Sequence, residues 1–407
     1  MKKSFGIFVA IAALLVAISG SIIVSRVFVA FLFVLCILLG RKESSFLNPY
    51  YLFSVTPLSL LIYVDISGKF MMELTAKTWG LAIINITAFI LAVYYSSDFK
   101  SLKNCTGPSD KKLIIHTLIL TAIGLFSEAF EYFMDRPFFL ASVLKLCSVP
   151  AIICALKSKR KILIIIVMAL FVGSSIGFLS KSAVLTYLIA LLIGIEKYYI
   201  RTKRERKSMA VYSTIGVFVM IISFTFANKD RGTRNASDTV DYYEQYGNVE
   251  WNSPDALFMP YMYLTTPWAN LQYLTETQDE RTYGMWLIKP LLGYLQLDDH
   301  FQSSYRMRAY STFNTFTFVS CNFKDFGYWL SIISSILLGF FVKKVYSRYR
   351  RSRSALDVAC YVYVGLAVLE MFFSNEFFTQ SFPFTIVIIM AIYKLFFFHN
   401  QRPQLEE

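Results

Sequence analysis

The chain has 407 residues, of which 56% are hydrophobic and only 16% are charged. A soluble domain carries about 25% charged and about 45–50% apolar residues, so this composition excludes a single water-soluble core. The apolar residues come instead in runs of roughly 20, the length that crosses a bilayer. The net charge of +13 is spread over short clusters between those runs, which argues against nucleic acid as a partner and for the phospholipid bilayer.

The apolar runs predict an all-α, polytopic membrane protein with about twelve transmembrane helices. A turn at Ser19–Ser21 separates the first two runs; if they formed one span, the topology of everything that follows would invert. In chain order, the predicted spans are 4–20, 22–40, 48–64, 78–96, 112–129, 137–156, 162–178, 183–200, 210–227, 327–345, 355–373 and 378–398.

Charge sets the expected orientation. With both termini in the cytoplasm, most of the 40 lysines and arginines fall on the cytoplasmic side, including the clusters at 201–207 and 343–353. Short cytoplasmic loops are enriched in these residues. We therefore expect a multi-pass bacterial inner-membrane protein with its largest loop in the periplasm.

That loop, residues 228–326, is too long to be a simple connector and is expected to have its own structure. It divides the chain into helices 1–9 (1–227), the loop with short interfacial helices (228–326), and helices 10–12 with a tail (327–407). Aromatic residues of this kind favour the bilayer surface; the expected anchors are Tyr261, Tyr263, Trp268, Tyr273, Tyr283 and Trp286.

Several cations fall on the periplasmic side, against the orientation rule. Guanidinium groups bind phosphate oxygens in a bidentate manner and ammonium groups bind them as point charges. A cluster of them would hold a lipid-linked diphosphate; the alternative is pairing with the loop's own acids or with ordinary lipid headgroups. The candidates are Arg231, Arg234, Arg306, Arg308 and Lys181.

Other polar residues are candidates for acid–base work. Glu128 is three residues from Glu131 on one helix face, and the alternative is a solvated helix end. Asp325 is the next candidate, with a helix cap as the alternative, and His300 is the last, with a solvated histidine as the alternative. Lys145, in the middle of the sixth predicted span, is expected to line a polar cavity or to form a structural ion pair.

Motifs for metal or nucleotide chemistry are missing from the sequence. The three histidines have no i, i+4 partner, and there is no glycine-rich phosphate loop. The cysteines fall mostly in apolar runs, as packing residues do. No metal and no cofactor is expected.

Three stretches resemble bacterial O-antigen polymerases of the Wzy type, the oligosaccharide repeat-unit polymerases. They are "NPYYLFSVTPLSLLIY" (48–63), "YLTTPWANLQYL" (263–274) and "STFNTFTFVSCNFKDFGYWLSIISSILLGF" (311–340). The layout of many spans with one long loop in the second half is similar too. Many relatives carry an arginine in the turn where this chain has Lys181.

The resemblance implies a GT-C-like, metal-independent glycosyltransferase that polymerises undecaprenyl-diphosphate-linked oligosaccharide repeat units at the periplasmic face. A chain-length-regulating co-polymerase is the expected protein partner. The resemblance also implies that Tyr263, Trp268, Asn270 and Asn314 bind substrate, alongside the cations named above. The alternatives are an O-antigen ligase, which uses the same donor, an oligosaccharide flippase or other transporter, and a purely structural membrane protein.

Overall fold

The computed structural model describes residues 2–43, 45–65, 73–96, 110–134, 144–177, 181–200, 202, 205, 258–277, 281–284, 315–352 and 354–373. Within these ranges every regular element is a helix, which confirms the all-α prediction. The elements are α1 (Lys2–Ser19), α2 (Ile22–Lys42), α3 (Pro49–Phe53), α4 (Val55–Asp65), α5 (Ala76–Tyr95), α6 (Asp110–Met134), α8 (Ser148–Ser158), α9 (Lys161–Gly177), α10 (Lys181–Tyr198), α13 (Phe258–Thr277), α15 (Phe318–Arg351), α16 (Ala355–Leu369) and the 3₁₀ turn η4 (Glu370–Phe372).

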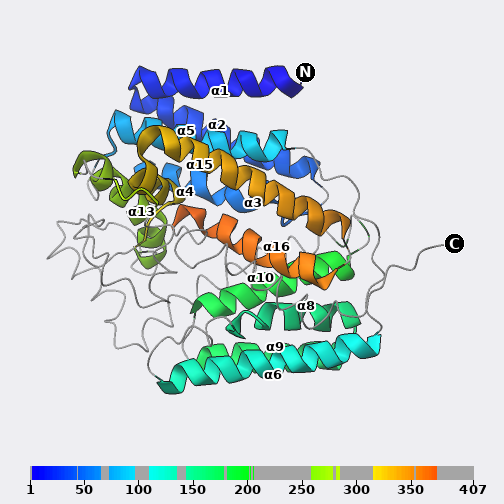
Figure 1. The fold of residues 1–407 in the computed structure, drawn as a ribbon. Helices are drawn as coiled ribbons and strands as arrows, with labels where there is room; N and C mark the ends of the chain where they lie inside the picture. The colour runs from blue at the N-terminus through cyan, green and yellow to red at the C-terminus, as the bar shows by residue number, and fades with distance from the viewer. Residues whose placement is uncertain are drawn as a thin grey trace.

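Most of these helices lie side by side in one bundle, from α1 at one edge to α6 at the other (Figure 1). The helix α13 lies at one end of the bundle, which we call the loop end. At the opposite end lie the basic residues that close α2, α10 and α15, among them Lys42, Lys197 and Arg351. We call this the basic end. Among the described residues, several of the cations used for the orientation prediction therefore lie at one end of the bundle.

In the part of the chain that the structure describes, four helical segments are long and apolar enough to cross a membrane: α2, α5, α15 and Ala355–Phe372. Shorter apolar helices cover Ser4–Ser19, Ser148–Ser158 and Lys161–Ser174. All but two of the predicted spans overlap with described helices, and those two, 210–227 and 378–398, lie outside the described residues. The total of about twelve spans stays a prediction.

The breaks between helices follow from local chemistry. Gly20 adopts a positive φ of 64° between α1 and α2, a conformation that glycine reaches at little cost. The two helices then pack against each other as separate elements, so they are not one long span. Pro57 has no N–H to donate to the carbonyl of Phe53, and the chain accordingly breaks at Ser54, between α3 and α4.

The most consequential break is inside α15, where Gly327 has φ 69° and ψ −162°. Asn322 and Ser335 would be about 20 Å apart along a straight helix. Instead the amide of Asn322 donates to the hydroxyl of Ser335 at 3.3 Å, and the hydroxyl of Ser334 donates to Asn322 at 3.2 Å. The short helix 318–326 therefore folds back against the long helix that follows Gly327.

Helix α5 supplies the partner that holds this hairpin. The hydroxyl of Ser335 donates to Oδ1 of Asn85 at 2.6 Å, and the amide of Asn85 donates to the hydroxyl of Ser331 at 3.3 Å. All three side chains are fully buried. A Cβ on Gly339 would stand 2.8 Å from the carbonyl of Phe89, so α5 and α15 approach too closely there for a larger residue.

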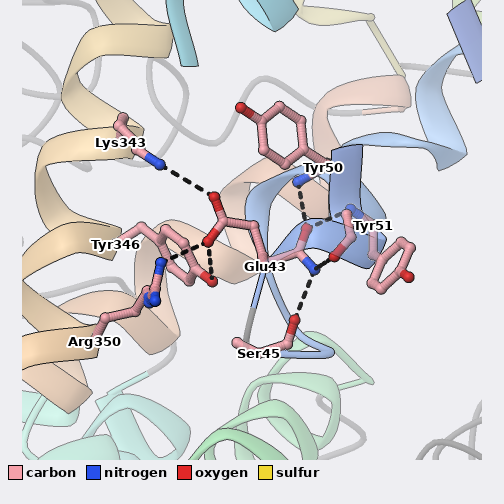
Figure 2. A network of polar contacts seen from close by, with 9 residues as sticks. Glu43, Ser45, Tyr50, Tyr51, Lys343, Tyr346 and Arg350 are labelled. Atoms are coloured by element: carbon pink, nitrogen blue, oxygen red, sulfur yellow. Dashed lines mark hydrogen bonds and ion pairs between the residues drawn. The ribbon is translucent and has the colours of Figure 1, made fainter. Parts of the chain in front are cut away.

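At the basic end, the carboxylate of Glu43, directly after α2, bonds to side chains of α15 (Figure 2). Glu43 accepts from the ammonium of Lys343 at 3.2 Å, from the guanidinium of Arg350 at 2.8 Å and from the hydroxyl of Tyr346 at 3.3 Å. A second carboxylate, Glu196 of α10, accepts from the hydroxyl of Ser45 and from the N–H of Phe46 in the loop after α2, both at 2.9 Å. The first group is named the Glu43 network.

Replacing Gly327 by alanine should destabilise the hairpin. An L-residue at this combination of positive φ and extended ψ, which is essentially restricted to glycine, costs about 1–3 kcal/mol, and the new Cβ would stand 3.0 Å from Nε of Arg281. We expect a lower thermal midpoint in detergent, measured by intrinsic fluorescence. Gly173→Ala is the matched control, because nothing lies within 4 Å of its Cβ position. Equal midpoints for the two variants would contradict a strained turn at Gly327.

Replacing Glu43 by glutamine should destabilise the basic end, because it removes the carboxylate that pairs with the ammonium of Lys343, which is only 9% exposed. Breaking a buried pair from one side costs about 3–5 kcal/mol. Arg350→Gln should cost less, since that side chain is 36% exposed. The double variant Glu43→Gln/Lys343→Gln should be more stable than Glu43→Gln alone. If the two losses simply add in thermal unfolding, the pair is not coupled.

Candidate functional site

The three stretches that resemble polymerases meet at the loop end. The indole N–H of Trp268 in α13 donates to the hydroxyl of Ser59 in α4 at 2.9 Å. The amide of Asn270, also in α13, donates to the carbonyl of Thr315 at 2.7 Å. Segments about 200 residues apart in sequence thus form one packed unit, and this unit is the candidate site.

A short strip, residues 281–284, closes the end of the helix 318–326. The N–H of Thr282 donates to the carbonyl of Lys324 at 3.3 Å, and the N–H of Tyr283 donates to the carbonyl of Asp325 at 3.0 Å. The hydroxyl of Thr282 donates to Oδ1 of Asp325 at 2.5 Å. Carbonyls in the last turn of a helix have no partner within it, so the strip satisfies them and fixes the position of Asp325.

Arg281 completes this closure. Its Nη1 donates to the carbonyl of Phe323 at 3.4 Å, and its guanidinium carbon lies 4.4 Å from the centroid of the Phe323 ring. A cation at the C-terminal end of a helix interacts favourably with the helix dipole. The loop end therefore carries a guanidinium that is anchored on one side and half-buried.

Two adjacent charged residues are buried inside this unit. Lys324 is 0% exposed and Asp325 is 2% exposed. Ionisable side chains are rarely buried so completely, and within a membrane protein they mark functional sites by default. Asp325 was predicted as a base or as a helix cap at the start of a span. It lies instead near the C-terminal end of the short helix, where its carboxylate accepts the Thr282 hydroxyl, so it does not cap an N-terminus.

The aromatic and amide residues predicted to bind substrate take different positions. Trp268 and Asn270 are fully buried, with their polar atoms bonded to Ser59 and Thr315. Trp268 is therefore not at the bilayer surface as expected; it holds α13 in place. Tyr263 is half-buried, and its ring meets Phe373 edge-on at 6.2 Å.

Lys145 lies in a break of the chain rather than in the middle of a continuous helix. A turn at Leu146 and Cys147 precedes α8. The carbonyl of Leu146 accepts the hydroxyl of Tyr363 at 3.0 Å, and Tyr363 stands near the midpoint of α16. Lys145 is half-buried, so a cation lies about half-way along the bundle, as an intramembrane residue would.

The remaining predicted residues are placed only in part. Glu128 belongs to the second half of α6, and Lys181 is the first residue of α10, at the loop end. The other candidates lie outside the described residues, and their roles stay predictions; they are Arg231, Arg234, His300, Arg306, Arg308 and Asn314.

Sequence reasoning missed Lys77, Arg281 and Lys324. Each is a cation on the predicted periplasmic side, so the orientation rule that singled out Arg231 would have selected them as well. Among the residues that the structure describes, no group of three or more histidine, cysteine, aspartate or glutamate side chains is placed to hold a metal ion. Comparisons with family models, curated proteins and solved structures gave no match for this chain.

Two replacements of Asp325 distinguish the contribution of its hydrogen bond to stability from that of its negative charge. Asp325→Ala removes the acceptor of the buried Thr282 hydroxyl, which should cost about 1–3 kcal/mol of stability. Asp325→Asn keeps an oxygen acceptor at the same place and should retain most of that stability. Thermal unfolding in detergent measures both. If the asparagine variant is as unstable as the alanine variant, the negative charge rather than the hydrogen bond holds the strip.

Proposed function

We propose that this protein is a polysaccharide polymerase that joins undecaprenyl-diphosphate-linked oligosaccharide repeat units at the periplasmic face of the bacterial inner membrane. The observation that carries the proposal is the meeting of α4, α13 and 315–340 at the loop end. These are the stretches that resemble O-antigen polymerases, and they enclose the buried charges of Lys324 and Asp325.

The reaction needs a leaving group and a nucleophile but no nucleotide. The bond from the growing chain's anomeric carbon to the diphosphate oxygen breaks, and the diphosphate leaves with the electron pair. A hydroxyl of the incoming lipid-linked unit attacks that carbon and passes its proton to a base. The polysaccharide thus moves onto the incoming unit, which is still attached to its own lipid.

Cations stabilise the charge that develops on the departing diphosphate. The proposed clamp consists of Arg231, Arg234 and Arg306, with Arg308 and Lys181 as further phosphate or sugar contacts. The base, where one is needed, is drawn from Asp325, Glu128 and His300. Lys145 lines the interior of the bundle in this proposal, and Asn314 contributes to binding of the oligosaccharide.

The charge distribution supports the orientation in the membrane. Basic residues close several helices at one end, and the candidate site lies at the other. Because positive loops stay in the cytoplasm, the loop end belongs to the periplasm. About twelve spans, a GT-C-like architecture and a chain-length-regulating co-polymerase complete the proposal.

A purified-protein assay tests the activity. The protein is reconstituted in nanodiscs with the undecaprenyl-diphosphate-linked repeat unit of its own strain, and the products are separated by size. A ladder of multimers, with release of undecaprenyl diphosphate, is the expected result. Transfer only to lipid A core would identify a ligase instead. Movement of the lipid across vesicle bilayers without any new glycosidic bond would identify a flippase.

Alanine at Arg231, Arg234 or Arg306 should abolish the ladder while leaving protein amounts in the membrane unchanged. Each loses a charge-assisted contact to the leaving group, and loss of such an electrostatic contact costs about a hundredfold or more in rate. The Asp325→Asn protein belongs in the same assay, since a base role requires its carboxylate. Unchanged ladders from all three arginine variants would remove the clamp from the proposal.

A further inference from the structure

Two cations at the loop end flank one pair of aromatic rings. Nζ of Lys77 lies 5.6 Å from the ring centroid of Tyr328. The guanidinium carbon of Arg281 lies 4.4 Å from the ring centroid of Phe323. The two rings meet edge-on, with their centroids 5.2 Å apart. Lys77 of α5 and Arg281 of the strip 281–284 thus both lie beside this aromatic pair, next to the Gly327 turn.

Both cations keep donors to spare. The ammonium of Lys77 donates to the carbonyl of Thr275 at 2.9 Å, and Arg281 uses Nη1 on the carbonyl of Phe323. An ammonium has three N–H donors and a guanidinium has five. Across the described ranges, no carboxylate forms an ion pair with either residue. Lys77 is exposed and Arg281 is half-buried, so the remaining donors are accessible in part.

The position of Lys77 makes the site attractive to an anion. It is in the first turn of α5, where the helix dipole already places partial positive charge, so a cation there is unfavourable alone. An anion bound at this place gains from the partial positive charge of the helix start as well as from the two side chains. Phosphate oxygens match this donor set.

An apolar stripe begins directly beside these cations. Trp329, which follows Tyr328, is 78% exposed. The other exposed members, Leu330, Ile333, Leu337 and Phe340, recur at helical spacing along one face of α15. Ten residues of helix cover about 15 Å, half of the roughly 30 Å hydrocarbon thickness of a bilayer. The stripe therefore descends through one leaflet from the cations.

We infer that Lys77 and Arg281 bind the diphosphate headgroup of a polyprenyl-diphosphate lipid, with its first isoprene units along the exposed face of α15. This inference rests on the proposed function and gives the lipid-linked substrate a place on described residues. The cations match the headgroup, and the stripe matches a long hydrocarbon chain that arrives laterally within the outer leaflet. The remaining donors of both side chains make the contacts to the phosphate oxygens.

Binding of undecaprenyl diphosphate, without sugar, tests this site directly. The full-length protein is placed in phosphatidylcholine nanodiscs, and affinity is measured by native mass spectrometry. Lys77→Gln and Arg281→Gln should each weaken binding about tenfold or more, since each removes charge-assisted hydrogen bonds. Lys344→Gln is the matched control, an exposed lysine on α15 at the basic end. The thermal midpoint of Arg281→Gln shows whether that variant is folded. If it is not, Lys77→Gln still tests the site.

Competitors distinguish the sources of phosphate. Phosphatidylglycerol at equal mole fraction, or inorganic pyrophosphate at the same concentration, should displace little of the lipid. The inference is overturned if either competitor displaces the bound lipid as well as undecaprenyl diphosphate itself does, or if both glutamine variants bind the lipid with unchanged affinity. A wild-type ladder with unchanged lipid affinity in the variants would leave the polymerase proposal standing while this site fails. If the glutamine variants bind the lipid more weakly but the wild-type protein makes no ladder, the lipid site stands and the polymerase proposal fails.

Discussion

The backbone reversal at Gly327 is the constraint on which the loop end depends. It turns the short helix 318–326 back along α15, so that Asn322 reaches Ser334 and Ser335. Asn85 of α5 then bonds to Ser335 and Ser331, which fixes the hairpin against the bundle. In a bilayer, polar groups must find partners inside the protein, so the serine and asparagine side chains make the reversal possible as much as the glycine does.

The reversal explains why charge collects where it does. It presents the last carbonyls of the short helix to the strip 281–284, which brings Arg281 beside Phe323 and Thr282 beside Asp325. It also brings Tyr328 against Lys77. Cations from two separate parts of the chain thus lie beside one turn. The proposed site for an anionic, lipid-linked substrate rests on this convergence, with Lys77 exposed and Arg281 half-buried.

Much of this architecture could be predicted from apolar periodicity, because runs of about 20 apolar residues have few alternatives to a helix. The segment 318–326 could not, since polar residues at Ser320, Asn322 and Lys324 are typical of a surface loop. Its burial depends on Ser334 and Ser335 beyond the turn. The contacts of Lys77 and Arg281 with aromatic rings could not be predicted either, because Tyr328 is 251 residues from Lys77 and Phe323 is 42 residues from Arg281. Asp325 was named from the sequence as a candidate, but its place near the end of the short helix was not predicted.

The Glu43 network has a consequence for how the protein is made. Lys343 and Glu43 are 300 residues apart, so their contact forms only after both have emerged from the ribosome and been inserted. In the proposed orientation Lys343, Arg348 and Arg350 lie on the cytoplasmic side, where positive residues retain their segment during insertion. After insertion the same ammonium is 9% exposed and neutralised by a carboxylate. In that orientation one side chain has two roles: its charge orients the segment during insertion, and its ion pair with Glu43 then joins α15 to the end of α2.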